Sequence, residues 1–217
     1  MKNKSLLAWH FVDHNRRLRN GQPLVIGEWL QHDGKPVLCM SGYHASAKAL
    51  DALIYRRSNM VCRVECAGPI VHGNDKLVCS RRKALWCFDA TTVLREFARW
   101  CALQVIDYWD CPAIVRIWLE TGDAKFQCDA SDSIQNTYYC RAYSPFRNTA
   151  WNAAAGAARS AITGSAHEAA CNAAQSVSAG SFCSANHSVY TTALDVVWRK
   201  YNAKLEKMLK AAYRASL

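Results

Sequence analysis

Two consecutive segments in the second half of the chain carry small residues at helical spacing. The positions are Ala150, Ala154, Ala157 and Ala161 in the first segment, and Ala166, Ala170, Ala173 and Val177 in the second. Alanine stripes let two helices approach closely, although each residue buries little area. The repetition therefore predicts two similar helices that pack backbone to backbone.

Capping signals bound these two helices. Ser144 is a typical N-cap and is followed by Pro145 at the first helical position. Ser165 and Glu168 form a capping box for the second helix, which is expected to end at Gly180.

A last helix is predicted from about Val189 to Ala215. One of its sides carries Leu194, Val197, Tyr201, Leu205, Met208 and Ala212. This apolar side either covers the alanine-rich pair or pairs with a second copy of the chain. A homo-oligomer through the C-terminal helices is therefore one expectation.

Two further helices are predicted before the alanine-rich segments. Asp89 caps the first, from about Ala90 to Tyr108. The second runs from Pro112 to Thr121 and stops at Gly122, an arrangement of Pro and Gly that is typical of a helix. Residues 123–143 are polar and aromatic and receive no assignment.

The first 88 residues are predicted to be rich in strands. The expected strands are Leu6–Val12, Leu24–Leu30, Lys35–Met40, Val61–Cys66 and Lys76–Cys79. Ser46 is expected to cap a short helix that ends at Tyr55, and residues 73–75 are expected to form a turn. The predicted fold is α+β: a small N-terminal β-sheet with a packed helix, followed by a mainly α-helical C-terminal half.

The chain is expected to divide into three segments. Residues 1–88 form a strand-rich core with the candidate site, residues 89–143 are a helical continuation of the same domain, and residues 144–217 are an alanine-rich helical appendage. A long alanine-rich extension is more typical of a structural or oligomeric element than of a catalytic one.

Composition favours a protein of a reducing compartment. The chain has 217 residues, 51% of them apolar, without an apolar run long enough to span a membrane. Its 11 cysteines are an odd number without a Cys-x-x-Cys pair, which favours reduced thiols, and the start lacks a typical export signal. We therefore expect a soluble protein of the cytoplasm, with no membrane partner.

The charge balance of 27 basic to 17 acidic residues favours nucleic acid, nucleotides or an acidic protein surface as partners. The basic residues gather in clusters near the N-terminus, after residue 75 and in the last helix. Candidate contacts to nucleic acid or other anions are Arg16, Arg17, Arg81, Arg82 and Lys83. The alternative is that these clusters are only solvated surface.

Polar side chains that can carry chemistry gather after Gly42, which is expected to allow a bend where a side chain would clash. Tyr43, His44 and Ser46 follow within four positions, and Lys76 is a further candidate for ligand binding. The imidazole of His44 has no evident packing reason at this place and suits proton transfer or anion binding. The alternative is that such residues only pack and hydrogen-bond.

Other kinds of site fit the sequence less well. Cys39 with His44, and Cys62 with Cys66, could offer zinc ligands, but their spacing is not that of common zinc sites, so no metal is predicted. Neither a phosphate-binding Gly-rich loop nor a Gly-x-Ser-x-Gly motif is present.

The first 120 residues resemble a family of uncharacterised proteins from tailed phages and prophages. The resemblance lies in Cys39, Gly42-Tyr43-His44-Ala45-Ser46, Leu50-Asp51-Ala52-Leu53, Tyr55, Arg63-Val64-Glu65 and Asp75-Lys76. Members of this family often end in alanine-rich helices that contain Trp. The resemblance implies an anti-host, anti-defence or genome-modifying role.

A second, weaker resemblance is to small ADP-ribosyltransferase-like domains, which use NAD as substrate. It implies that His10 binds a ribose hydroxyl, that Tyr43 stacks on nicotinamide and that Ser46 fixes the adjacent group. Glu65 or Asp75 would then stabilise the positive charge on the ribose as nicotinamide leaves. Glu65 follows Ser46 by only 19 residues, which is early for that plan, and helices replace the strands expected after residue 89.

Three functions remain open. The first is transfer of ADP-ribose from NAD to nucleic acid or a host protein, with His10, Glu65 and Asp75 as catalytic residues. The second is non-catalytic binding that sequesters a nucleotide or a host defence factor. The third is a DNA-associated structural phage component. In the alternative of purely structural roles, His10 is a packed histidine, and Glu65 pairs with Arg63 or Lys76 at the surface.

Overall fold

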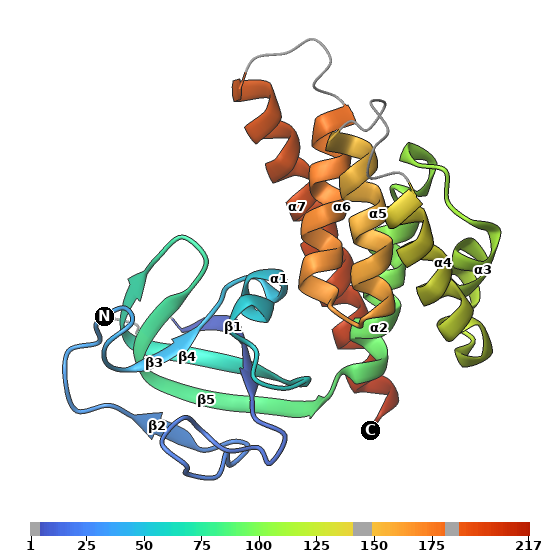
Figure 1. Ribbon diagram of the computed structural model, residues 1–217. Coiled ribbons are helices and arrows are strands. Elements are labelled where there is room, and N and C mark those ends of the chain that lie inside the picture. The colour runs from blue at the N-terminus through green and yellow to red at the C-terminus, as the bar shows by residue number, and fades with distance from the viewer. Residues whose placement is uncertain (1–4, 141–148, 181–186) are drawn as a thin grey trace. The chain divides into compact units, whose positions relative to one another are not determined.

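The computed structural model describes residues 5–140, 149–180 and 187–217. Strands come first and helices follow, as Figure 1 shows, so the predicted α+β fold is confirmed. The strands are β1 (Leu6–Val12), β2 (Trp29–Gln31), β3 (Tyr43–Ala45), β4 (Met60–His72) and β5 (Leu77–Asp89). The helices are α1 (Ala49–Ala52), α2 (Thr91–Leu103), α3 (Ala113–Thr121), α4 (Gln127–Cys140), α5 (Thr149–Ile162), α6 (Ala166–Gly180) and α7 (His187–Ala215).

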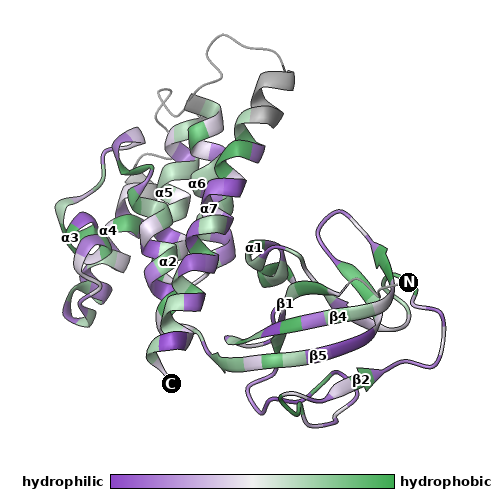
Figure 2. Cartoon of the chain, turned by 180° about the vertical axis from the view of Figure 1, so that it is seen from behind, coloured by the Kyte–Doolittle hydropathy of each residue, from purple (hydrophilic) through white to green (hydrophobic). Residues whose placement is uncertain are grey.

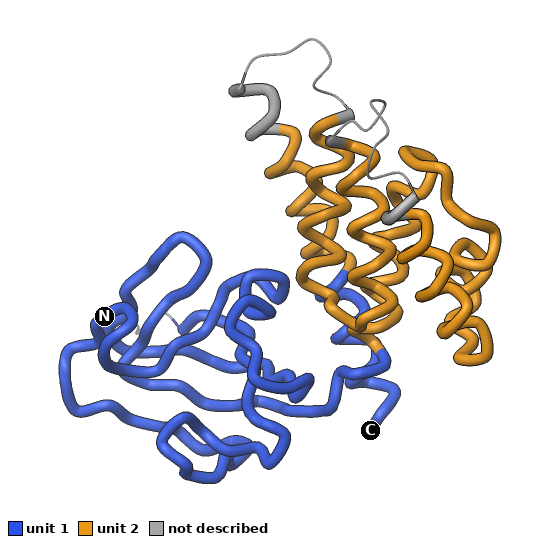
Figure 3. The backbone as a smooth tube through the Cα atoms, in the orientation of Figure 1, with its two compact units in different colours: residues 1–92, 205–217 blue, residues 93–204 orange. Residues whose placement is uncertain are grey.

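The chain forms two compact units, which Figure 3 distinguishes by colour. Unit 1 comprises residues 1–92 and 205–217, and unit 2 comprises residues 93–204. The C-terminal turns of α7 therefore belong to the sheet-containing unit. Within that unit, Tyr213 stacks on Trp86 of β5 with ring centroids 4.5 Å apart. Stacked aromatic rings bury large apolar surfaces, so this contact holds the chain end to the sheet.

The long hairpin of β4 and β5 organises unit 1. Each strand has 13 residues, and the turn between them is closed by a hydrogen bond from the Gly73 N–H to the Lys76 carbonyl. Predicted strands at Leu6–Val12 and Val61–Cys66 are confirmed, the second as part of β4. The strand expected at Lys76–Cys79 continues to Asp89, because backbone pairing with β4 carries it through the charged residues 81–83.

The sheet of unit 1 curls so far that the residue after β3 pairs with β1. Its strand order is β1-β4-β5-β2, and β3 pairs with β5 beyond the end of β2. Directly after β3, the Ser46 N–H donates to the Trp9 carbonyl of β1 at 2.9 Å, and the Trp9 N–H donates back at 2.8 Å. This pair of bonds joins β3 to β1. The curl creates an inner face lined by small and apolar side chains, among them Val64 and Ala84.

Four local predictions in this region were wrong. Within Leu24–Leu30 only the first two residues of β2 form a strand, and Lys35–Met40 is a turn in which the Ser41 and Val37 backbones bond to each other. The strand lies instead at Tyr43–Ala45, where a turn was expected. Ser46 does not cap a helix, because its backbone is engaged with Trp9, and α1 begins three residues later. Local composition could not reveal these long-range pairings.

Unit 2 is built around the predicted alanine-rich pair, α5 and α6. Each helix buries a row of alanines, including Ala154 and Ala170 with no exposed area, and Figure 2 colours much of both helices toward the hydrophobic end. The Ser176 hydroxyl donates to the Ala150 carbonyl at 2.7 Å, which fixes their register. Close packing of the two stripes is therefore confirmed. The caps predicted at Ser144 and Pro145 lie outside the described residues.

The remaining helices agree with the predicted boundaries within a few residues. The Asp89 carboxylate accepts from the Thr91 N–H at 2.9 Å at the start of α2, and Gly122 ends α3 with a φ of 68°. The unassigned segment contains α4. On α7, Tyr201 and Leu205 are almost fully buried within the chain, which leaves these two side chains no free surface for a second copy. No helix in the described ranges has the length and apolar character needed to cross a bilayer.

Candidate functional site

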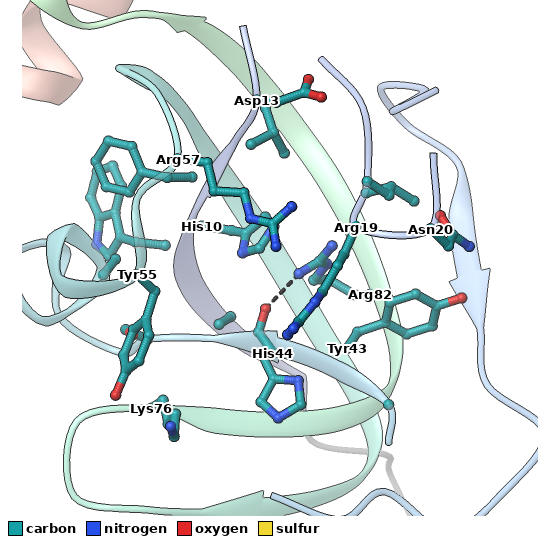
Figure 4. Close-up of a pocket in the computed structure, with 18 of the residues that line it drawn as sticks. His10, Asp13, Arg19, Asn20, Tyr43, His44, Tyr55, Arg57, Lys76 and Arg82 are labelled. Atoms are coloured by element: carbon teal, nitrogen blue, oxygen red, sulfur yellow. Dashed lines mark hydrogen bonds between the residues drawn. The ribbon is translucent and has the colours of Figure 1, made fainter. Parts of the chain in front are cut away.

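A pocket of about 550 Å³ opens on the inner face of the curled sheet in unit 1. Its walls come from β1 and the loop after it, from β3 and the turn before it, and from β5, as Figure 4 shows. Seven residues that the sequence nominated line it together: His10, Tyr43, His44, Ser46, Lys76, Arg17 and Arg82. They come from β1 and the loop after it, from β3 and the residue after it, from the β4–β5 turn and from β5, so the fold brings distant polar groups to one cavity.

The pocket is strongly cationic. The basic residues that line it are Arg17, Arg19, Arg57, Lys76 and Arg82. The carboxylate of Asp13 is the one acidic group among its described lining residues, and the Arg17 N–H donates to that carboxylate at 2.6 Å. A low-dielectric cavity with this excess of positive charge concentrates anions.

Arg82 lies at the floor of the pocket and is only 4% exposed. Its guanidinium donates to the backbone carbonyl of His44 and lies 5.4 Å from the centre of the Tyr43 ring. Among the described residues no carboxylate lies within ion-pairing distance of it, and burial lowers the pKa of Arg82 from its usual value. A buried charge without an opposite charge is costly, and it is typical of a site that an anionic ligand completes.

His10 on β1 faces the same cavity. Among the described residues neither of its ring nitrogens has a hydrogen-bond partner. Burial, and next the positive charge of Arg82, hold the pKa of His10 well below the usual 6.5, so the imidazole is neutral near pH 7. The alternative of a satisfied, packed histidine does not describe this side chain, because its polar atoms remain available.

His44, in contrast, has a clear packing role. Its Nε2 accepts from the Cys39 N–H at 2.9 Å, and a further hydrogen bond links the ring to the Gly42 backbone. Burial lowers the pKa of His44, and the nearby Lys76 and Arg82 lower it further. The expectation that no packing reason places an imidazole here was wrong, because His44 holds the turn at residues 37–41 against β3.

Tyr43 and Ser46 line the pocket but are also engaged in structure. The Tyr43 hydroxyl donates to the Gln31 carbonyl at 3.2 Å, and Arg82 covers one face of its ring. Ser46 is 2% exposed, and its backbone joins β3 to β1. Stacking of Tyr43 on a ligand ring would therefore have to use its other face.

The two nominated carboxylates do not line the pocket. Glu65 lies opposite Lys83 in the hairpin, and the two side chains form an ion pair at 3.0 Å. Hydrogen bonds from Lys83 and Ser5 lower the pKa of Glu65. Glu65 is thus a paired carboxylate, as expected for a purely structural role, although its partner is neither Arg63 nor Lys76.

Asp75 lies in the hairpin turn beside the pocket rim. It accepts a 2.5 Å hydrogen bond from the hydroxyl of Tyr55, a lining residue, and this bond raises the pKa of Tyr55. The Lys76 ammonium lies 4.6 Å from the centre of the same ring. Asp75 therefore positions Tyr55 at the rim.

Of the basic residues nominated as anion contacts, Arg17 and Arg82 line the pocket, whereas Arg16 does not. Arg81 and Lys83 instead lie over the ring of Trp29, at 4.7 and 4.6 Å from its centre. Alternation explains the split, because successive residues of a strand point to opposite faces of the sheet.

Sequence reasoning missed three charged lining residues as members of the site: Asp13, Arg19 and Arg57. They lie in the loop after β1 and in the segment between α1 and β4, where no sequence spacing marks them. Arg19 was visible only as part of the N-terminal basic cluster.

The cysteines that the structure describes are free thiols. Cys62 of β4 and Cys87 of β5 lie directly opposite each other, and their hydrogen bond is the main reason that the pKa of Cys62 is raised. No group of three or more His, Cys, Asp or Glu in the described part of the chain is placed to hold a metal ion.

Residues 6–96 match the profile of a family described as "Domain of unknown function (DUF7666)". The match contains every residue that lines the pocket. No curated protein matches the chain, and no solved structure does. The site of this chain therefore lies wholly within the segment that is similar to that family.

Proposed function

We propose that unit 1 binds a phosphorylated nucleotide in the cationic pocket. The observation that carries this proposal is Arg82, a buried guanidinium without a carboxylate partner among the described residues, at the floor of a cavity lined by four further cations. Guanidinium groups bind phosphate oxygens through paired, charge-assisted hydrogen bonds. A phosphate in contact with Arg82 would supply the opposite charge that the described residues do not provide.

The size and lining of the cavity favour a nucleotide over a free phosphate ion. A cavity of about 550 Å³ is in the range of sites for small organic ligands and cofactors. Apolar groups such as Leu18 and Ala52, and the partly exposed ring of Tyr55, line it beside the cations. A ligand with an anionic end and a flat apolar end fits this combination.

In this proposal the protein sequesters a nucleotide in the cytoplasm. Free thiols in the described residues agree with a reducing compartment. An anti-host or anti-defence role in a phage-infected cell, a host protein as partner and assembly through the C-terminal helices remain proposals of the same kind. The DNA-associated alternative would use Arg81, Lys83 and Trp29, which lie together outside the pocket.

Calorimetric titration of the full chain with ADP, ATP and NAD tests nucleotide binding. We expect at least one to bind, with an affinity that falls as salt is raised from about 50 to 300 mM, because exposed rim cations contribute. Arg57→Gln should weaken binding by about three- to tenfold. The matched control Arg95→Gln removes the same charge from an exposed site on α2 and should change nothing. Folded protein that binds none of the three nucleotides contradicts the proposal.

A second candidate is ADP-ribosyl transfer from NAD. His10, Tyr43 and Ser46, the three residues that this resemblance nominated for NAD, line one cavity. The carboxylate available there is Asp13 rather than Glu65, so Asp13 would have to stabilise the positive charge on the ribose.

Release of nicotinamide from NAD measures this second activity. If the chain is a transferase, we expect Asp13→Asn to slow release by about tenfold or more, because the developing charge loses its carboxylate. Glu65→Gln should leave the rate unchanged, since Glu65 pairs with Lys83 away from the pocket. No release by the original protein, or equal rates in both variants and the original, would exclude this mechanism.

A further inference from the structure

We propose that the floor of the pocket binds a terminal phosphate monoester, and that His10 makes the site prefer a monoester to a phosphodiester. This inference rests on the proposed nucleotide binding and narrows the class of ligand. It assigns to His10 a role in specificity that does not require catalysis.

Three guanidinium groups surround the space beside His10, that of buried Arg82 at the floor and those of exposed Arg19 and Arg57 at the rim. Figure 4 shows those of Arg19, Arg57 and Arg82 directed toward the space beside His10, from the loop after β1, the loop before β4 and β5. A terminal phosphate presents three oxygens that no other group esterifies, whereas a diester presents two. Three separate guanidinium forks therefore match a monoester better than a diester.

The unpartnered imidazole supplies the second part of the argument. A neutral imidazole has one N–H donor and one acceptor nitrogen, and both are unsatisfied in His10 among the described residues. The acceptor nitrogen requires a proton, which a guanidinium-bound phosphate can share with it. A phosphate monoester loses its second proton with a pKa of about 6, so it can carry or accept this shared proton near neutrality. A diester has no second proton and carries one negative charge only.

The shared proton should make the affinity for a phosphate monoester depend on pH. Bound as a dianion, the phosphate offsets the positive charges that lower the pKa of His10, so His10 takes up a proton in the complex. Because the complex holds a proton that the free protein lacks, affinity for a monoester should fall as pH rises above neutrality. The titratable and charged groups that face His10 or the cavity beside it are Arg82 of β5, Tyr43 and His44 of β3, Cys62 of β4, Asp13, Arg17, Arg19, Cys39, Tyr55, Arg57 and Lys76.

Calorimetry with AMP and with its 5′-methyl phosphodiester tests the inference, since the two differ by one methyl group on the phosphate. At about pH 6.5 we expect AMP to bind about tenfold more tightly or better. Titrations in two buffers of different ionisation enthalpy should show proton uptake with AMP alone. His10→Gln should remove the preference, and the control His72→Gln, at an exposed position of β4 outside the pocket, should keep it.

Each outcome decides between the inference and the proposed function. Equal affinities for the two ligands, both weakened by Arg57→Gln, would overturn the monoester preference and leave nucleotide binding intact. A preference that persists in folded His10→Gln would overturn the role of His10. If folded protein binds neither of these ligands nor ADP, ATP or NAD, the proposed function itself fails.

Discussion

Replacing Arg82 with methionine will remove nucleotide binding without unfolding the protein. Truncation of one buried, hydrogen-bonded charge from a complex costs roughly 2–5 kcal/mol, which corresponds to a loss of affinity of about 30-fold to several thousandfold. Arg82 is 4% exposed and its charge faces the pocket, so we expect a loss in the upper part of this range. Calorimetric titration of the variant with the nucleotide that binds the original protein measures it.

The stability of Arg82→Met, unlike its binding, should change little. Removal of an unpaired buried charge stabilises a fold, whereas the lost hydrogen bond to the His44 carbonyl destabilises it by roughly 1 kcal/mol. We therefore expect the free energy of unfolding, measured in urea, to stay within about 2 kcal/mol of the original. Because Arg82 lowers the pKa of His10, the same variant should raise that pKa, which an NMR titration of the imidazole detects.

Arg82→Lys separates charge from geometry. Lysine keeps the positive charge but has no planar fork, so its affinity should lie between that of the original protein and that of the methionine variant. Unaltered nucleotide affinity in Arg82→Met would show that the ligand does not reach the floor of the pocket. A large loss of stability in that variant would show that Arg82 is structural.

The sequence predicted the parts of the fold that depend on local periodicity. The alanine stripes of α5 and α6, the Pro and Gly at the two ends of α3, and β1 were all visible, because residue spacing, end residues or an apolar run marks each of them within a short segment. The length of β5 could not be predicted from the sequence. Its charged middle looks unlike a buried strand, and only pairing with all of β4 keeps it extended.

The site could be predicted in part for the same reason. Tyr43, His44 and Ser46 were nominated by residue type, and His10 by a resemblance. Their convergence follows from the bond pair that joins Trp9 to Ser46. Burial of Arg82 could not be foreseen from its neighbours, which are also basic. Its position depends on the alternation of β5 and on the curl of the sheet, both of which are properties of the whole unit.

Gly42→Ala should cause the largest loss of stability among single substitutions near the site. Gly42 has a φ of +98°, which a residue with a Cβ rarely adopts, and that conformation alone costs on the order of 1–3 kcal/mol. An added Cβ would also lie 2.8 Å from a methyl group of Val78 and 3.1 Å from both the Cys79 carbonyl oxygen and Pro36. Val78 and Cys79 are fully buried in β5, so neither side can move away, and overpacking adds a further 1–3 kcal/mol or so.

Gly21→Ala provides the control that separates these two costs. Gly21 has a similar φ of +83°, but nothing lies within 4 Å of an added Cβ. We expect urea denaturation to give a loss of roughly 1–3 kcal/mol for Gly21→Ala and roughly 2–6 kcal/mol for Gly42→Ala. Equal losses would show that the contact with β5 is not tight. A larger loss at Gly42, together with weaker nucleotide binding, would show that the pairing of β3 with β5 sets the position of His44. The carbonyl of His44 in turn accepts from the guanidinium of Arg82 at the floor of the pocket.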